Sequence, residues 1–408
     1  MRTTLRAHVS LRPGRRRVVM AVLLLLLTVA GLATQAGGRG RRLAGEWLTC
    51  LLSGRAPAGT PPGADGVPAP VLQTLGEPGL DATTGNWSAA GLDRLPGVTV
   101  AVLDSGVDAG HNALSAAVLP GLDLINLCGD AHSDAFGHGT QVAGVIAGTG
   151  SGIAPGVRIL PIRTSPWPGV QLRIANAAAI VLAAGNGADV INISSSSNSG
   201  RESVMEHAAI RYAVRRGAVV VASAGNDAAV PARYPAAYPE VISVTAADAD
   251  GGLAAWAAWK GGIDVAAPGA QVVTTVAGGG YVRASGTSFA APYVAGVVAR
   301  MKAADPRLTP AEIERILVET ARAPDGSRGK SQTLPAVDPA AALAAVSDAP
   351  KGSHRPTDEA YPPAEFRGAA GRDAGDRLTG PPQSGATSAR ISPRVTSLTA
   401  CGPPTTTP

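Results

Sequence analysis

The sequence predicts an α/β protein with a doubly wound parallel sheet flanked by helices. One observation predicts this class, and two describe its core. Short apolar runs rich in β-branched residues alternate with helical stretches through the middle of the chain, and this alternation is typical of βαβ units. Apolar residues make up 45 % of the 408 residues, which is enough to bury a sizeable core. Aromatic residues make up only 3 %, so small aliphatic side chains must fill that core.

Five apolar runs have the length and composition of buried parallel strands. Such strands are covered on both faces, so they show a continuous apolar pattern rather than alternation. The runs lie at residues 98–103, 158–163, 189–193, 218–222 and 241–245. Helices are expected between or after them, at residues 140–148, 170–184, 203–216, 287–304 and 310–323.

The chain outside residues 97–346 has a different texture. Residues 1–36 pass from an Arg-rich stretch through a short apolar run to small residues, the order of a secretory signal peptide. An uncleaved N-terminal membrane anchor is the alternative, and either one places the folded part outside the cytoplasm. Residues 37–96 are rich in Gly and Pro and predict an extended arm. Residues 347–408 are predicted to form a disordered tail.

Charge and cysteine content narrow the possible partners. The formal net charge of +5 arises from the Arg-rich N-terminal stretch, so no basic patch on the folded part indicates a nucleic-acid partner. No His/Cys cluster has metal-ligand spacing, and no cofactor is expected from it.

The chain has three cysteines, Cys50, Cys128 and Cys401. A bridge between Cys50 and Cys128 is the favoured pairing, and three free thiols are the alternative.

Three segments hold the residues whose chemistry matters. Asp104 follows the first predicted strand, at the carboxyl end where parallel sheets place active sites. His138 lies between two glycines at the start of a predicted helix, and Ser288 lies at a helix start preceded by Gly286. Each residue alone is a weak signal, because Asp and Ser commonly cap helices. Together, in the order Asp, His, Ser, they predict a catalytic triad.

These segments resemble the signatures of the subtilisin-like serine proteases, the subtilase family. Four stretches match the family's signatures for the Asp, the His, the oxyanion-hole Asn and the Ser: residues 98–106, 137–144, 221–226 and 285–296. The likeness spans residues 97–345 and implies a subtilisin-like fold and a serine endopeptidase. It implies Ser288 as the nucleophile, His138 as its general base and Asp104 as the partner of the His. Asn226 would donate to the oxyanion.

Within this family the chain is most similar to the mycosins, the cell-envelope subtilases that accompany type VII secretion systems. Residues 156–165, 288–298 and 335–343 carry the resemblance. It implies polypeptide substrates, a secreted or cell-envelope location and type VII secretion components as partners. Mycosins also have an N-terminal extension clamped to the catalytic domain by a disulfide, for which Cys50 and Cys128 are suitably placed. Mycosins usually end in a membrane helix, and this chain carries no second apolar run of that kind.

Two further features predict which residues line the substrate cleft. Ser194, Ser195 and Ser196 begin where the family usually has Ser-Leu-Gly on the strand that pairs with substrate, although they could also form a plain polar loop. Arg233 falls in a segment that resembles the floor of the primary specificity pocket, where an Arg can pair with a substrate carboxylate. Arg233 could instead point to solvent, and Asp227 would neutralise it if the two were adjacent.

The leading prediction is therefore a secreted or cell-envelope serine endopeptidase. One alternative is a mycosin-like structural component of a type VII secretion system. Another is an inactive binding module with a subtilase fold, which the filled catalytic positions disfavour. Subtilases often bind calcium, but no contiguous run of acids identifies a site in this sequence.

Overall fold

The computed structural model describes the central part of the chain: residues 95, 97–126, 129–165, 173–196, 200–322 and 334–348. The predicted signal segment or anchor and almost all of the predicted arm lie outside these residues, as do Cys50, Cys128 and Cys401. The disulfide therefore stays a prediction.

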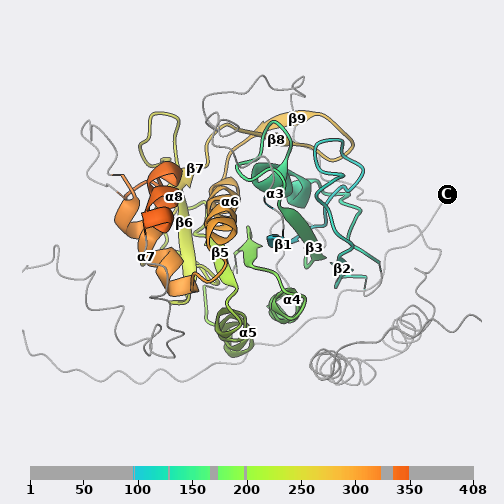
Figure 1. Ribbon diagram of the computed structural model, residues 1–408, viewed down its shortest axis with the longest axis horizontal. Coiled ribbons are helices and arrows are strands. Elements are labelled where there is room, and N and C mark those ends of the chain that lie inside the picture. Colours follow the sequence, from blue (N-terminus) through green and yellow to red (C-terminus); the bar gives the residue numbers. More distant parts are fainter. Residues whose placement is uncertain are drawn as a thin grey trace, which may run out of the picture. The chain divides into compact units, whose positions relative to one another are not determined.

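A seven-stranded parallel sheet forms the centre of this region (Figure 1). The strand order is β2-β3-β1-β4-β5-β6-β7, and every neighbouring pair is parallel. The strands are Leu122–Asp123 (β2), Arg158–Arg163 (β3), Thr99–Asp104 (β1), Val190–Ile193 (β4), Val219–Ser223 (β5), Val241–Ala247 (β6) and Val265–Pro268 (β7). The predicted α/β class with a parallel sheet is confirmed.

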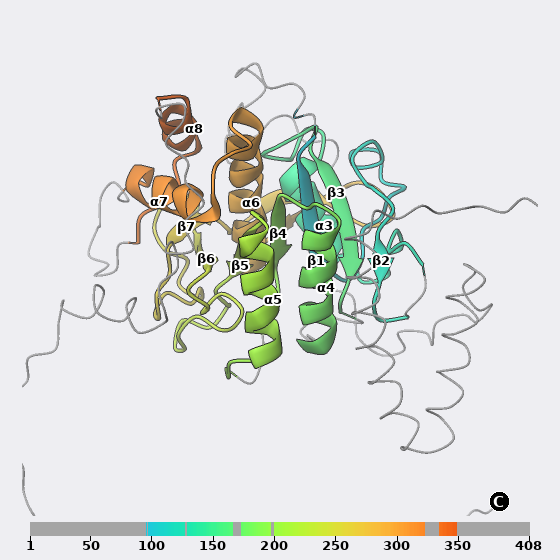
Figure 2. The same cartoon turned by 60° about the horizontal axis from the view of Figure 1, so that its bottom comes forward.

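Helices cover both faces of the sheet, and the alternation of side chains along β1 shows how. Val100 and Val102 belong to a core cluster with α3 (His138–Ala147) and α6 (Thr287–Ala304). Ala101 and Leu103 belong to a second cluster with α4 (Arg173–Gly185) and α5 (Val204–Arg215). Figure 2 shows α4 and α5 side by side on their face of the sheet. The sheet is therefore buried on both sides, as its continuous apolar strands require.

Two further helices and a hairpin complete the described region. Helices α7 (Pro310–Thr320) and α8 (Pro339–Asp348) pack against each other, and α8 also packs against α6. The antiparallel pair β8 (Val272–Thr275) and β9 (Tyr281–Ala284) packs against α3. None of the helices that the structure describes is long and apolar enough to cross a membrane.

The hairpin fixes α3 through side chains and a close backbone approach. The Thr275 hydroxyl donates to the backbone oxygen of Thr140 at 2.7 Å. Gly144 permits this contact, because a Cβ there would overlap the hydroxyls of Thr274 and Thr275. Helix α3 therefore packs against β1, against its neighbour α6 and against the hairpin, which gives its first residue a fixed position.

The predicted strands agree with the observed ones to within two residues at each end, and α6 was predicted at its observed bounds. Helix α7 ends at Thr320, three residues before its predicted end. Helix α8 continues through Ser347 to Asp348, so the folded region extends two residues beyond the predicted boundary of the tail. The short β2 and strands β7 to β9 were not predicted.

Candidate active site

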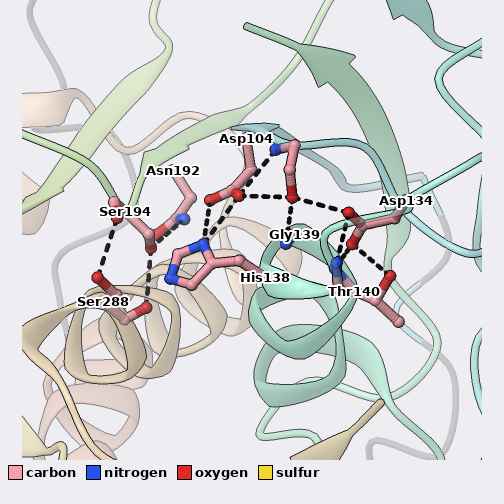
Figure 3. Close-up of polar contacts among 10 residues, drawn as sticks. Asp104, Asp134, His138, Gly139, Thr140, Asn192, Ser194 and Ser288 are labelled. Atoms are coloured by element: carbon pink, nitrogen blue, oxygen red, sulfur yellow. Dashed lines mark hydrogen bonds and ion pairs between the residues drawn. The ribbon is translucent and has the colours of Figure 1, made fainter. Parts of the chain in front are cut away.

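The structure brings Asp104, His138 and Ser288 together from three elements (Figure 3). Asp104 is the last residue of β1, His138 is the first residue of α3, and Ser288 is the second residue of α6. From β1 the chain moves to β3 on one side and then crosses to β4 on the other. In open α/β sheets, such a switch in direction leaves a crevice at the carboxyl ends of the strands, where ligands bind.

A three-centre hydrogen bond joins the acid to the base, because one ring nitrogen contacts both carboxylate oxygens. The Nδ1 atom of His138 lies 2.8 Å from Oδ1 and 3.0 Å from Oδ2 of Asp104. Asp104 is buried, whereas the side chain of His138 is 26 % exposed. Because Nδ1 is held by the carboxylate, Nε2 is the ring nitrogen available to a reacting group.

The environment of His138 favours its protonated form. Burial alone would lower the pKa of His138, but the charge of Asp104 and its hydrogen bond raise it, and the charge of Asp134 raises it further. The net effect is a pKa above the ordinary value for histidine. This arrangement stabilises the imidazolium that forms when His138 accepts a proton.

The hydroxyl of Ser288 donates to the backbone oxygen of Ser194 at 3.0 Å, and no hydrogen bond joins it to His138 within the described region. Ser194 donates in return from its own hydroxyl to the backbone oxygen of Ser288 at 2.9 Å. Asn192, buried near the end of β4, donates from Nδ2 to the Ser194 hydroxyl at 2.9 Å. The start of α6 is therefore attached to the end of β4.

The three serines predicted to line the substrate cleft differ in which of their groups are accessible to a substrate. The Ser194 side chain is 3 % exposed and directed at α6, so its backbone is what it can offer to a substrate. Ser195 and Ser196 are half-buried and follow directly after it. This placement at the carboxyl end of β4, beside Ser288, is compatible with the predicted backbone pairing of an extended peptide.

Asn226 is oriented by a residue that sequence reasoning did not single out. Its Oδ1 atom accepts hydrogen bonds from the Thr287 backbone N–H at 2.9 Å and from the Thr287 hydroxyl at 2.8 Å. The Nδ2 group is thereby directed away from Thr287 and lies 3.5 Å from where a Cβ on Gly286 would be. The absence of a side chain at Gly286 keeps the space in front of this donor open.

Arg233 and Asp227 lie close to Asn226 in the sequence but form no ion pair with each other. The Arg233 backbone N–H donates to the Ala224 oxygen at 3.1 Å, which places Arg233 beside the segment that carries Asn226. Its side chain is half-buried and forms no ion pair with any acid that the structure describes. Asp227 is exposed and accepts a hydrogen bond from the Ala229 backbone N–H. The charge of Arg233 is therefore not neutralised by Asp227.

Asp134 was also missed by the sequence analysis. It lies buried in the loop before α3 and accepts hydrogen bonds from backbone N–H groups on both sides of His138. An Asp shortly before a helix start is a capping signal, so the sequence contained a hint of its position. Its side-chain contact with Ser105 could not be read from the chain, since the two are 29 residues apart.

Within the part of the chain that the structure describes, no group of three or more His, Cys, Asp or Glu side chains could hold a metal ion.

The fold and the site together define an α/β protein with an Asp–His pair facing a serine at a helix start. The chain belongs to the subtilase family, whose model matches residues 96–349. It is 40 % identical over 209 residues to the thermophilic serine proteinase of Bacillus sp. strain AK1, covering 50 % of this chain and 51 % of that relative. It is 34 % identical over 270 residues to alkaline elastase YaB of Bacillus sp. strain YaB, covering 64 % and 65 %. The chain thus spans about half to two thirds of the length of these relatives.

Solved structures show the same fold. The MycP3 protease from the type VII (ESX-3) secretion system is 32 % identical, with a TM-score of 0.56, covering 66 % of this chain and 91 % of that one. A protease from Pseudoalteromonas arctica is 33 % identical, with a TM-score of 0.57, covering 66 % and 94 %. The predicted subtilisin-like fold is confirmed.

Proposed function

We propose that this chain is a serine endopeptidase that cleaves polypeptides with Ser288 as nucleophile, His138 as general base and Asp104 as the residue that orients the base. The observation that carries the proposal is the three-centre hydrogen bond between Asp104 and His138 at the carboxyl edge of the sheet, with Ser288 close by on α6. Membership of the subtilase family supports the same assignment.

The chemistry follows from this geometry. The Ser288 hydroxyl turns from the Ser194 oxygen toward Nε2 of His138, gives up its proton and attacks the carbonyl carbon of the substrate. The carbonyl oxygen becomes an oxyanion, which the Nδ2 group of Asn226 and the backbone N–H of Ser288 stabilise. His138 then passes the proton to the leaving amine. A water molecule, deprotonated by His138, attacks the acyl-enzyme, and His138 returns that proton to the departing Ser288 oxygen as the second product is released.

Active-site labelling tests this proposal. A fluorophosphonate probe reacts with an activated serine, so we expect it to label the protein covalently at Ser288. Ser288→Ala should abolish labelling and peptidase activity. Ser285→Ala is the matched control, because Ser285 is exposed three residues earlier and binds Gln271 instead of the triad. It should leave both unchanged. Labelling that survives in Ser288→Ala would refute the assignment.

We also propose that the peptidase acts outside the cytoplasm. The targeting pattern in residues 1–36 supports this, and a relative from Xanthomonas campestris pv. campestris carries the name extracellular protease. N-terminal sequencing of the protein recovered from culture medium and envelope would distinguish cleavage from anchoring. Recovery of the full chain from the cytoplasm alone would contradict the proposal.

The similarity to the MycP3 protease favours one specific role, association with a type VII secretion system. If this role is correct, the full chain should co-purify with secretion components in an envelope complex, and Ser288→Ala should still do so. Recovery of the whole protein free of any such complex would exclude the role and leave the peptidase proposal intact.

A further inference from the structure

Asp134 is 6 % exposed and receives four hydrogen bonds. Its Oδ1 atom accepts from the Gly137 backbone N–H and from the Ser105 hydroxyl, both at 2.8 Å. Its Oδ2 atom accepts from the Thr140 backbone N–H at 2.8 Å and from the Thr140 hydroxyl at 2.7 Å. Figure 3 shows Asp134 beyond the start of α3, on the side of Asp104 away from Ser288. It therefore does not reach the reacting atoms.

Two of these bonds control the backbone at the general base. Gly137 directly precedes His138, and Thr140 lies two residues after it. Gly137 adopts φ 86°, a left-handed conformation that glycine accepts most readily. One buried carboxylate thus holds both sides of His138 at the first turn of α3, which fixes the direction in which the imidazole leaves the backbone.

A third hydrogen bond of Asp134 joins it to Ser105, which also contacts Asp104, the acid of the triad. The Ser105 hydroxyl lies 2.8 Å from Oδ1 of Asp134 and 3.2 Å from Oδ1 of Asp104, and it accepts from the Gly139 backbone N–H at 3.0 Å. A hydroxyl has one proton to donate, so it cannot serve both carboxylates at once. The shorter contact assigns that proton to Asp134. Asp104 then keeps the Ser105 backbone N–H and His138 as its donors.

We propose that Asp134 is a positioning residue of the active site, which acts through Ser105 on Asp104 and through the backbone on His138. By taking the Ser105 proton, Asp134 leaves the charge of Asp104 free to bind the imidazolium. If Asp134 lost its charge, the Ser105 hydroxyl would turn to Asp104 and weaken the hold of Asp104 on His138. The kinetic part of this inference rests on the proposed function.

The charges around His138 support the inference. Among the described residues, its titratable neighbours are Asp104 from β1 and Asp134 from the preceding loop, and the charges of both raise the pKa of His138 against the effect of burial. Helix α6 presents Ser288 and the ring of Phe289, whose centroid lies 5.8 Å from that of the imidazole, and neither is charged. Burial raises the pKa of Asp134 itself, although its four hydrogen bonds oppose this effect.

The first test uses Asp134→Asn, which removes the charge and keeps the shape. Because the base is misoriented but the substrate contacts remain, we expect kcat to fall about 10- to 100-fold with little change in KM. The acidic limb of the pH profile of kcat/KM should move to lower pH, since His138 loses a charge that raises its pKa. If Asp134→Asn does not fold, Asp134→Ser, which keeps a capping oxygen without the charge, takes its place.

Ser105→Ala tests the proposed route. It removes the hydroxyl between the two carboxylates but leaves the bonds from Asp134 to Gly137 and Thr140. If coupling passes through Ser105, the loss of kcat caused by Asp134→Asn should be smaller in the Ser105→Ala background than in the wild type. Losses that multiply independently would overturn the route through Ser105.

A titration separates this inference from the peptidase proposal. The pKa of His138 can be measured by NMR in the Ser288→Ala protein, where no activity is required. Asp134→Asn should lower it. Asp338→Asn is the matched control, because Asp338 is also 6 % exposed and caps α8 through Ala340 and Ala341. It should lower the melting temperature without moving the His138 titration. A folded Asp134→Asn protein with an unchanged His138 pKa would refute the inference, even if wild-type activity were absent.

Discussion

Ser288 and Ser194 hold each other through reciprocal hydrogen bonds from hydroxyl to backbone oxygen, at 3.0 Å and 2.9 Å. The nucleophile candidate on α6 is therefore tied to the end of β4, the strand next to β1 in the sheet. In this arrangement the Ser194 oxygen holds the Ser288 proton. A substrate N–H that takes over the Ser194 oxygen would free the Ser288 hydroxyl to turn toward His138.

This pair predicts the effect of Ser194→Ala. The substitution keeps the backbone oxygen of Ser194 but removes the donor to the Ser288 oxygen and the acceptor for Asn192. One lost buried hydrogen bond costs about 1 kcal/mol, and more where a polar partner is left unpaired. We expect a lower free energy of unfolding in urea and a reduced kcat. Unchanged values of both would show that the contact is not formed in solution.

The triad residues should act as a unit. Ser288→Ala and His138→Ala should each remove nearly all peptidase activity without unfolding the domain, because proton transfer needs both side chains. The double variant should be little worse than either single one, as is known for subtilisin. Turnover of peptide substrates, with circular dichroism as the check on folding, measures this. Wild-type turnover in Ser288→Ala would show that another residue is the nucleophile.

Sequence reasoning was reliable where the physical signal is local. The strands of the sheet centre are buried on both faces, so their apolar residues are contiguous in the chain. The short β2 and the β8–β9 pair mix apolar with polar residues, and the edge strand β7 offers only three apolar residues before a proline. The Ala-rich sequence of α8 shows no clear apolar period. These elements depend on contacts with the rest of the fold.

The same contrast applies to the site. Asp104, His138 and Ser288 stand in long signature segments, so their sequence context was enough to single them out. The partners that orient them are distant in the chain: Thr287 lies 61 residues from Asn226, and Ser194 lies 94 residues from Ser288. Only the packed fold brings such pairs together, and for this reason the support around the triad was not predicted.

Asn226 should contribute to the transition state and little to substrate binding. Thr287 fixes the amide so that Nδ2 is available to the oxyanion, which exists only after attack on the carbonyl. Asn226→Ala should lower kcat about 100- to 1000-fold with KM nearly unchanged, the range that loss of such a donor has in subtilisin. Steady-state kinetics on a peptide substrate provides the test. An equal loss of binding, seen as a raised KM with normal kcat, would contradict this role.

Thr287→Val provides a matched test of the orientation of Asn226. Valine keeps the shape of threonine but removes the hydroxyl that donates to Asn226 at 2.8 Å, while the backbone N–H contact remains. We expect a fall in kcat that is smaller than that of Asn226→Ala. In the Asn226→Ala background the same substitution should have little further effect on kcat, because the amide that it orients is gone.

We expect Arg233 to determine which substrate residue the peptidase prefers immediately before the scissile bond. Its backbone N–H donates to the oxygen of Ala224, two residues before Asn226. Arg233 is half-buried and forms no ion pair with Asp227. A planar guanidinium in a partly desolvated position binds carboxylates bidentately. We therefore propose a preference for Asp or Glu at this substrate position and discrimination against Lys and Arg.

A peptide-library cleavage profile of the wild type and of Arg233→Gly measures this preference. The variant should lose the preference for acidic residues and keep its turnover of neutral peptides, because the triad is untouched. Asp227→Asn is the matched control: Asp227 lies on the same loop but is exposed and bound to Ala229, so its removal should change the profile little. High salt should weaken the acidic preference of the wild type, since the pairing is between charges at a partly exposed position. A preference for basic or large apolar residues that Arg233→Gly leaves unchanged would rule out this role for Arg233.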